Sequence, residues 1–218
     1  MNPLRSIAPT VAIVLLPFSG SVWGQANFEG IWNPSHPPRM GQPAGGDIHL
    51  TAAGRAEYES FSPEKDPTLR CLMPGIPLGL VDPYPLEIVQ QEHQVLFLYE
   101  HFHQVRRIYM DGREAPDHWL PSLGGYSTGH WEGETLVIRT TLLSADNYMW
   151  TAGYPFSGDE DTYVIERYSR DGDELSFRGE VYDPTNYSEP YVVNGHWEFA
   201  PDGEIWEYEC IPEYGGVQ

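Results

Sequence analysis

The sequence predicts an all-β fold, an antiparallel meander that closes into a β-barrel, with one short helix and long loops rich in proline and glycine. Three observations support this prediction. Short stretches that alternate apolar and polar residues recur from residue 86 onward. Turn signals separate them, at Asp111-Gly112, Glu132-Gly133, Asp171-Gly172 and Asp202-Gly203. The chain also holds 20 prolines and 22 glycines. Sequential hairpins build a meandering sheet, and closure into a barrel removes its edges.

The first 24 residues are predicted to be a secretory signal peptide. Arg5 provides a positive start, residues 7–18 form an apolar core too short to span a membrane, and Gly24 lies among small residues at the expected cleavage site. We therefore expect one domain over residues 25–218, located in the periplasm or secreted, with no stable membrane insertion. The sequence does not indicate an oligomeric state.

The remaining elements follow from local patterns. A first strand is expected over residues 27–33, and a short polar helix from Thr51, its N-cap, to about Phe61. Proline-rich loops surround that helix. Nine or ten strands are expected in all, the later ones over residues 86–91, 95–100, 105–110, 126–131, 135–142, 162–169, 174–182, 191–199 and 204–210.

Charge and cysteine content limit the possible partners. The formal net charge is −20, which argues against nucleic acids and anionic membrane surfaces as partners. The two cysteines, Cys71 and Cys210, could form one disulfide between a central loop and the last strand in an oxidising compartment, and two free thiols are the alternative. No Gly-x-Ser-x-Gly elbow, phosphate-binding glycine loop or Cys-x-x-Cys motif occurs.

A Gly-x-Trp motif occurs at Gly30-Ile31-Trp32, Gly129-His130-Trp131 and Gly195-His196-Trp197, each time inside an expected strand. Glycine at such a position permits close approach, and tryptophan packs across the sheet or closes a barrel end. The first copy, within NFEGIW, resembles the opening strand of lipocalin-like (calycin) barrels. This resemblance implies a lipocalin-like architecture.

From Leu50 onward the chain also resembles a group of secreted bacterial proteins whose reaction is not established. The resemblance rests on LTAAGRAEYE, PYPLEIVQ, VRRIYMDGRE, GYSTGHWEGETLVI and the Asp183-Pro184 turn. It implies a compact β-barrel with a pocket. Relatives often carry histidines after the turn at Asp111-Gly112-Arg113 and in the aromatic-rich loop of residues 143–160. At these two places this chain has Glu114-Ala115-Pro116 and Tyr154-Pro155-Phe156. Any chemistry of those histidines would be moved or changed here.

Candidate functional residues concentrate in residues 95–138, which hold four of the eight histidines. If the strand there is unbroken, one face carries Phe97, Tyr99, His101, His103, Arg107 and Tyr109. Burying such groups is costly unless they are paired or wetted, so we interpret this face as a pocket wall. A structural ladder, with Arg106 and Arg107 paired to carboxylates, is the alternative for the arginines.

The leading hypothesis is an enzyme without cofactors that performs acid/base chemistry on a small, largely apolar molecule: an isomerase, cyclase, lyase or hydratase. His101 and His103 would transfer protons, Arg107 would hold developing negative charge, and Tyr109 or Tyr126 would donate a proton. Substrate contacts would come from Tyr99, from His130 and from an aromatic loop that contains Tyr148 and Trp150 and would act as a lid.

Two other functions are alternatives. The first is a binding protein that holds a hydrophobic ligand without turnover. The second is a metal-dependent lyase or hydrolase, because His101-x-His103 has a spacing seen in metal sites, with His118, His130 or Glu100 as a third ligand. No metal or other cofactor is assigned by the sequence, and the expected partner is a small molecule.

Overall fold

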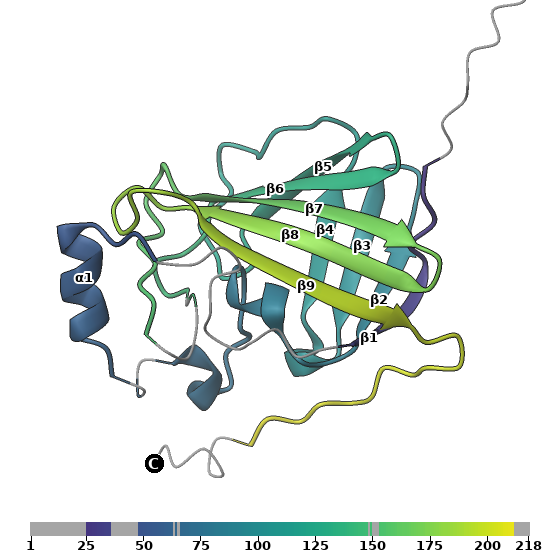
Figure 1. Ribbon diagram of the computed structural model, residues 1–218, viewed down its shortest axis with the longest axis horizontal. Coiled ribbons are helices and arrows are strands. Elements are labelled where there is room, and N and C mark those ends of the chain that lie inside the picture. Colours follow the sequence, from purple (N-terminus) through teal and green to yellow (C-terminus); the bar gives the residue numbers. More distant parts are fainter. Residues whose placement is uncertain are drawn as a thin grey trace, which may run out of the picture.

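The fold is taken from a computed structural model that describes residues 25–35, 48–62, 64, 66–147, 149 and 153–211. The predicted signal peptide lies outside these residues. Nine strands close into a single barrel, shown in Figure 1, and this confirms the predicted all-β class. The strands are β1 (Gly30–Pro34), β2 (Leu86–Gln90), β3 (Gln94–Tyr99), β4 (Val105–Tyr109), β5 (Tyr126–Glu132), β6 (Thr135–Thr141), β7 (Tyr163–Asp171), β8 (Glu174–Tyr182) and β9 (Tyr191–Phe199).

Each strand pairs with its neighbours in sequence, and β1 pairs with β9 to close the barrel. All of these pairings are antiparallel except the one between β4 and β5. Loop 110–125 returns the chain to the end of the barrel from which β4 started, so β5 runs parallel to β4. The predicted meander is therefore correct with one parallel exception.

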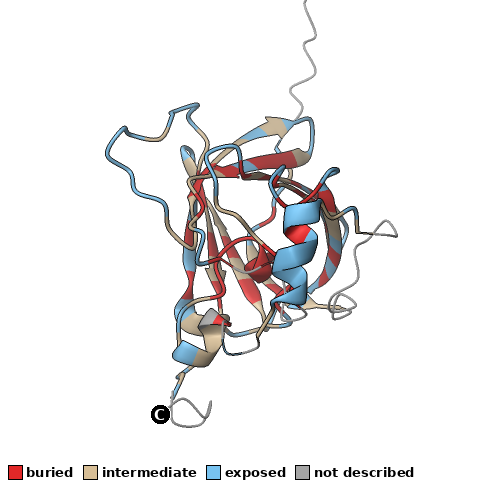
Figure 2. Cartoon of the chain, turned by 90° about the vertical axis from the view of Figure 1, so that its left-hand side faces the viewer, coloured by how far each residue is buried: buried red, intermediate tan, exposed pale blue. Residues whose placement is uncertain are grey.

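The barrel interior holds the apolar side chains that the alternating pattern predicts. Buried residues alternate with more exposed ones along the strands, and Figure 2 shows the buried residues lining the inside of the barrel. Trp32, Phe97, Ile138 and Tyr168 are among the largest fully buried side chains. Burying this apolar surface is the main favourable contribution to folding.

The Gly-x-Trp motifs lie in β1, β5 and β9, as the sequence predicts. Their glycines permit close packing. A Cβ atom added to Gly195 would lie 2.1 Å from the Phe177 ring, and one added to Gly30 would lie 2.5 Å from the Phe199 ring. Trp32 packs against the same Phe199 ring, with 5.2 Å between ring centroids. Glycine at these positions leaves room for an aromatic ring from the neighbouring strand.

The α-helix of the described chain, α1 (Ala52–Glu59), lies across one end of the barrel in Figure 1. Thr51 is its N-cap, as predicted, and its side chain accepts a hydrogen bond from the Gly54 N–H at 3.0 Å. Gly54 is the buried residue of the helix, and a Cβ atom there would lie 2.2 Å from the Asn186 carbonyl oxygen. This close approach holds the polar helix against the loop that precedes β9.

Three short 3₁₀ helices occur in the described chain: η2 (Pro67–Arg70), η3 (Leu78–Val81) and η4 (His101–His103). All four residues of η3 are buried. Its Leu80 Cδ1 lies 3.3 Å from the position of a Cβ on Gly179 of β8, so this segment packs against the inner face of the barrel wall. The proline-rich loop expected before β2 therefore contains a buried segment of the core.

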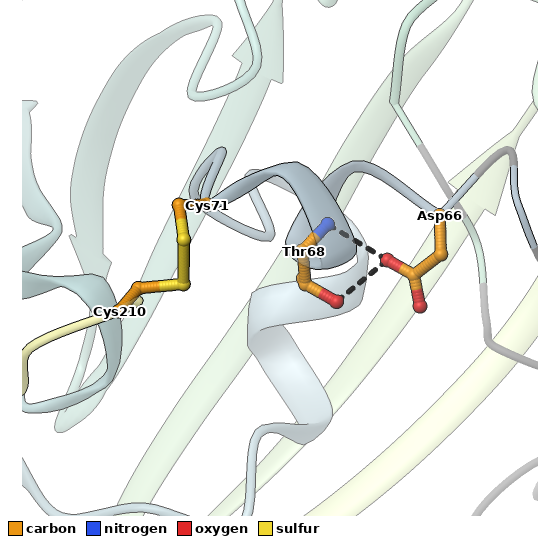
Figure 3. The surroundings of a disulfide bond; sticks show 4 residues. All are labelled: Asp66, Thr68, Cys71 and Cys210. Carbon is orange, nitrogen blue, oxygen red and sulfur yellow. Dashed lines mark hydrogen bonds between the residues drawn. A yellow bond between two sulfur atoms is a disulfide. The ribbon is translucent and has the colours of Figure 1, made fainter. Parts of the chain in front are cut away.

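The expected last strand, residues 204–210, is wrong. This segment forms no ladder and instead runs as an extended strap along the outside of the barrel, visible in yellow below the strands in Figure 1. The edge of β9 that it would need is already occupied by β1. A disulfide between Cys71 and Cys210 attaches the strap to the segment after η2, as Figure 3 shows. The predicted cysteine pairing is present, but it joins two loops.

Candidate functional site

The central histidine segment does not continue as a strand. β3 ends at Tyr99 and β4 begins at Val105, and η4 forms the turn between them. Phe102 and His103 adopt left-handed backbone angles, with φ of 56° and 49°. The expected shared face for Tyr99, His101, His103 and Arg107 is therefore wrong, because the turn breaks the alternation.

The turn decides which of the two adjacent arginines enters the barrel. Phe97 is opposite Arg106 in the β3–β4 register, and both side chains are buried. Arg107 consequently points outward and is exposed, and Val105 and Tyr109 lie on the same outer face of β4. Adjacent strand residues point to opposite faces, which is the signal in the sequence that one arginine of this pair is internal.

Arg106 lies at the centre of a buried polar network. Its guanidinium donates two hydrogen bonds to the Glu166 carboxylate, at 2.9 and 2.5 Å, and further bonds to Ser127 and Thr140 at 3.0 and 2.6 Å. Tyr168 donates to the same carboxylate at 2.9 Å. A buried charge needs such pairing, because desolvation is otherwise too costly. No local pattern in the sequence connects residues 106 and 166.

Tyr99, a predicted substrate contact, lies inside the barrel beside this network. Burial, with a smaller contribution from the charge of Glu166, raises the pKa of Tyr99 to about 12, although Arg106 acts in the opposite direction. Tyr99 is therefore a neutral hydrogen-bond donor at physiological pH and a constituent of the interior.

The strand pairing with the fewest residue pairs in the barrel wall is the one between β4 and β5. Only two residue pairs join these strands, Ile108 with Ser127 and Tyr109 with Thr128, so residues 104–107 have no partner on β5. A lateral pocket with a volume of about 210 Å³ lies beside this gap. Its described lining consists of Met73, Gln104, Val105, Arg106, Arg107, Tyr109, Trp119, Ser122, Gly124, Gly125, Tyr126 and Ser127.

The lateral pocket is lined by residues that belong to both faces of the wall. Arg107 and Tyr109 come from the outer face of β4, whereas Arg106 and Ser127 belong to the interior network. Gln104 also belongs to the inner side, because it pairs with Tyr99 across the turn and is only 4% exposed. The pocket therefore lies beside the residues that form the polar network inside the barrel.

Three of the predicted site residues, Arg107, Tyr109 and Tyr126, meet in the lateral pocket. The Tyr109 and Tyr126 rings stack with their centroids 5.1 Å apart, and Trp119 packs edge-on against Tyr126 at 5.0 Å. Burial raises the pKa of Tyr126, whose hydroxyl donates to the Glu114 carbonyl oxygen at 3.3 Å. Sequence reasoning identified two of these rings and missed Trp119, which lies on the loop between β4 and β5.

The two predicted catalytic histidines lie in η4 and do not line the described part of this pocket. His101 Nδ1 lies 2.6 Å from an Asp82 carboxylate oxygen, and its ring stacks on Tyr84 with centroids 4.4 Å apart. His103 Nε2 accepts a hydrogen bond from the Tyr208 N–H of the strap at 2.8 Å. The proposed constellation of two histidines with Arg107 is thus divided between two places.

The strap contributes to the surroundings of the histidines. Its Trp206 N–H donates to a Glu100 carboxylate oxygen at 3.0 Å, and the Tyr208 ring packs edge-on against His101 at 4.8 Å. Asp82 was not predicted as a site residue. Its second oxygen is buried and has no hydrogen-bond partner among the described residues.

The other predicted contacts lie elsewhere. His130 is exposed on the outer face of β5, 3.2 Å from Glu132, and lines a shallow groove with Arg139 and Arg167. Tyr148 and Trp150 lie outside the described residues. Tyr154, from the same aromatic loop, stacks on Tyr58 of α1 with centroids 5.5 Å apart.

Within the described ranges, no group of three or more His, Cys, Asp or Glu side chains is arranged to hold a metal ion. The histidine pair expected to begin such a site is instead bonded to Asp82 and to the Tyr208 backbone. No described helix is both long and apolar enough to cross a membrane.

No protein family and no curated protein matches this chain. Among solved structures, it is similar to a secretary abundant heat soluble (SAHS) protein from Ramazzottius varieornatus. The two share 8% sequence identity and a TM-score of 0.40, over 82% of this chain and 98% of that chain. A similarity at this level does not indicate a function. The residues that line the lateral pocket limit the chemistry that is available there.

Proposed function

We propose that this protein is an exported binding protein that holds a small, ring-containing organic molecule in the lateral pocket without turning it over. The observation that carries this proposal is the composition of the lining. It combines the aromatic rings of Tyr109, Trp119 and Tyr126 with two arginines, Arg106 and Arg107, and its described part contains no histidine, carboxylate, amine or thiol. Phenols keep their protons near neutral pH. The pocket therefore offers apolar contact and hydrogen-bond donors, with no side chain suited to act as a general base.

The size of the pocket limits the ligand. An apolar cavity of roughly 150 Å³ accommodates benzene, and the lateral pocket has a volume of about 210 Å³. One ring with one or two substituents matches this space. The predicted signal peptide and the Cys71–Cys210 disulfide support export, because disulfides persist in oxidising compartments.

Binding can be tested with a panel of single-ring compounds and isothermal titration calorimetry. Trp119 is 39% exposed, so Trp119→Ala removes a pocket wall with little effect on folding. We expect it to weaken binding about tenfold or more. Trp206→Ala is the matched control, because Trp206 is 71% exposed on the strap and does not line the pocket. If both variants bind like the wild type, the ligand lies elsewhere.

A second candidate function is acid/base catalysis at His101, favoured by its 2.6 Å contact with Asp82. A carboxylate that holds one imidazole nitrogen orients the other for proton transfer. The test is to incubate each ligand found above with the wild type and with His101→Asn, and to monitor the ligand by NMR in heavy water. Deuterium incorporation or product formation by the wild type alone would support an enzyme. An unchanged ligand with both proteins would leave only the binding function.

A further inference from the structure

The lateral pocket lies against the edge of β4. Its lining includes Gln104 and the first three residues of β4, four residues that follow one another in the chain. Consecutive residues of a strand point to opposite faces of a sheet. One pocket can contact side chains of both faces where it meets the strand from the side, at its edge. Main-chain groups of β4 therefore belong to the surroundings of the ligand.

The strand register shows which main-chain groups point toward this gap. The Tyr99 N–H donates to the Gln104 carbonyl oxygen at 2.9 Å, so Gln104 directs its main-chain groups toward β3. In an antiparallel pair this direction alternates from one residue to the next. Arg106 therefore also faces β3 with its main chain. Val105 and Arg107 direct their N–H and C=O groups to the other side, toward β5 and the gap.

Three of these groups have no hydrogen-bond partner in the part of the chain that the structure describes. The β4–β5 ladder begins at Ser127, whose pairing engages the Arg107 C=O. One step earlier in the ladder Gly125 would be the partner, but its N–H donates to the Ser122 carbonyl oxygen and hydroxyl, at 3.2 and 3.0 Å. The Val105 N–H, the Val105 C=O and the Arg107 N–H are consequently left unpaired.

The unpaired edge is open to solvent. Val105 is 55% exposed, and Trp119 on the facing loop is 39% exposed. Unpaired N–H and C=O groups on a strand edge are a template for pairing with another main chain. Peptide-binding proteins use such edges: main-chain hydrogen bonds give affinity, and neighbouring pockets for side chains give specificity. In this barrel an aromatic-lined pocket lies directly beside the open edge.

We propose that the ligand of the lateral pocket is a short extended peptide with an aromatic side chain, which pairs through its main chain with the β4 edge. This rests on the proposed binding function and specifies its ligand class. A peptide N–H donates to the Val105 C=O, and peptide carbonyl oxygens accept from the N–H groups of Val105 and Arg107. The aromatic side chain of the peptide is the ring that the pocket holds.

The extent of the open edge favours a short peptide over a strand of another protein. The edge is open over residues 105–107, because β5 pairs with β4 from Ile108 onward. A peptide of two or three residues uses all of its unpaired groups. The formal net charge of −20 makes two copies of this chain repel each other, which disfavours a second copy as the occupant.

Three probes test the main-chain pairing in the wild-type protein. N-acetylphenylalanine N-methylamide has a ring and a peptide group on either side of it. Its analogue with both nitrogens methylated has no N–H donor, and ethylbenzene has the ring alone. We expect the first probe to bind most tightly by calorimetry and the other two about tenfold more weakly, because the Val105 C=O then receives no hydrogen bond. Equal binding of all three probes would overturn the proposal.

Two substitutions at one position separate the main chain of Arg107 from its side chain. Arg107→Ala removes the guanidinium and keeps the N–H, whereas Arg107→Pro removes both. Proline is tolerated at an edge position whose N–H makes no ladder bond. We expect Arg107→Pro to bind N-acetylphenylalanine N-methylamide about tenfold more weakly than Arg107→Ala does, and both variants to bind ethylbenzene equally. Thermal unfolding checks that both variants are folded.

Amide hydrogen exchange, measured by NMR on the wild-type protein, does not depend on the proline variant. The Arg107 N–H should exchange rapidly in the free protein. N-acetylphenylalanine N-methylamide at about ten times its Kd should slow this exchange about tenfold. The Ile108 N–H, which faces β3, is the control and should respond much less. A bound probe that leaves the exchange of Arg107 unchanged would overturn the proposal.

The outcomes distinguish the two levels of the proposal. If all three probes bind equally and Trp119→Ala weakens each, the binding function stands and the ligand class is wrong. If no probe binds in a Trp119-dependent manner, both fail. If the peptide probe is preferred and protects the Arg107 N–H, both are supported. Self-association that Arg107→Pro abolishes and Arg107→Ala retains, measured by light scattering, would assign the edge to a second copy and overturn the peptide ligand.

Discussion

Phe97 of β3 and Arg106 of β4 are directly opposite each other in the barrel wall, and both side chains are buried. This register sends Arg106 into the interior network and leaves Arg107 on the outer face of β4, in the lining of the lateral pocket. Two adjacent arginines consequently have different roles, one in holding the barrel together and one in the proposed recognition of a ligand.

The first prediction concerns the buried pair of Arg106 and Glu166. Arg106→Met leaves the Glu166 carboxylate buried without its cation, and we expect a loss of about 3–5 kcal/mol in the free energy of unfolding. The double variant Arg106→Met/Glu166→Leu should recover most of this loss. Urea unfolding measures both values. The control is Arg178→Met, which breaks the more exposed Arg178–Glu180 pair and should cost about 1 kcal/mol or less. Equal losses of unfolding free energy in Arg106→Met and Arg178→Met would contradict the interpretation that the buried pair contributes more to stability than the exposed one.

The second prediction concerns alkaline pH. Burial raises the pKa of Tyr99 to about 12 in the folded protein, above its ordinary value of 10.0. Between these values the folded state holds a proton that the unfolded state has released, so the stability contributed by this group is complete below pH 10 and is lost as the pH rises toward 12. Tyr99→Phe should unfold with a weaker dependence on pH in this window. Urea unfolding at several alkaline pH values measures this, with the exposed Tyr58→Phe as the control. An identical pH dependence in wild type and Tyr99→Phe would refute the prediction.

The third prediction concerns the disulfide. Cys71 and Cys210 are 139 residues apart in sequence, and a crosslink over such a span reduces the entropy of the unfolded chain. Replacing both cysteines with serine should lower the free energy of unfolding by about 4–5 kcal/mol on the chain-entropy model. The strap should also become a substrate for limited proteolysis near Trp206, detected by mass spectrometry. Resistance of the strap to cleavage would show that its bonds to Glu100 and His103 suffice to hold it.

The fourth prediction concerns the third Gly-x-Trp motif. Gly195→Ala places a methyl group 2.1 Å from a Phe177 ring carbon, so the ring or the strand must shift. Overpacking of this kind costs about 1–3 kcal/mol. Gly124→Ala is the control, since its nearest neighbour is the Met73 methyl group at 3.9 Å and it carries no positive φ. Thermal unfolding of the two variants should differ clearly, and equal midpoints would show that Phe177 moves without cost.

Much of the fold follows from local patterns in the sequence. The alternation of apolar and polar residues predicted strands β2 to β9 closely. Turn residues predicted the positions of the hairpins, and Thr51 predicted the start of α1. These features depend on neighbours only a few residues away, so a single chain read in order is enough to find them. The expected strand over residues 204–210 was wrong because strand formation also requires a free edge, and β1 occupies the edge of β9.

The site depends on relationships that local patterns do not contain. Residue order alone establishes that histidines, arginines and tyrosines gather in residues 95–138, and that Arg106 and Arg107 point to opposite faces of a strand. Folding selects Arg106 as the internal one, because the left-handed turn at Phe102 and His103 resets the alternation. Folding also brings His101 to Asp82, and it places Gln104 and Trp119 around one pocket. Such contacts join segments far apart in sequence, and they form only when the register of every strand between them is set.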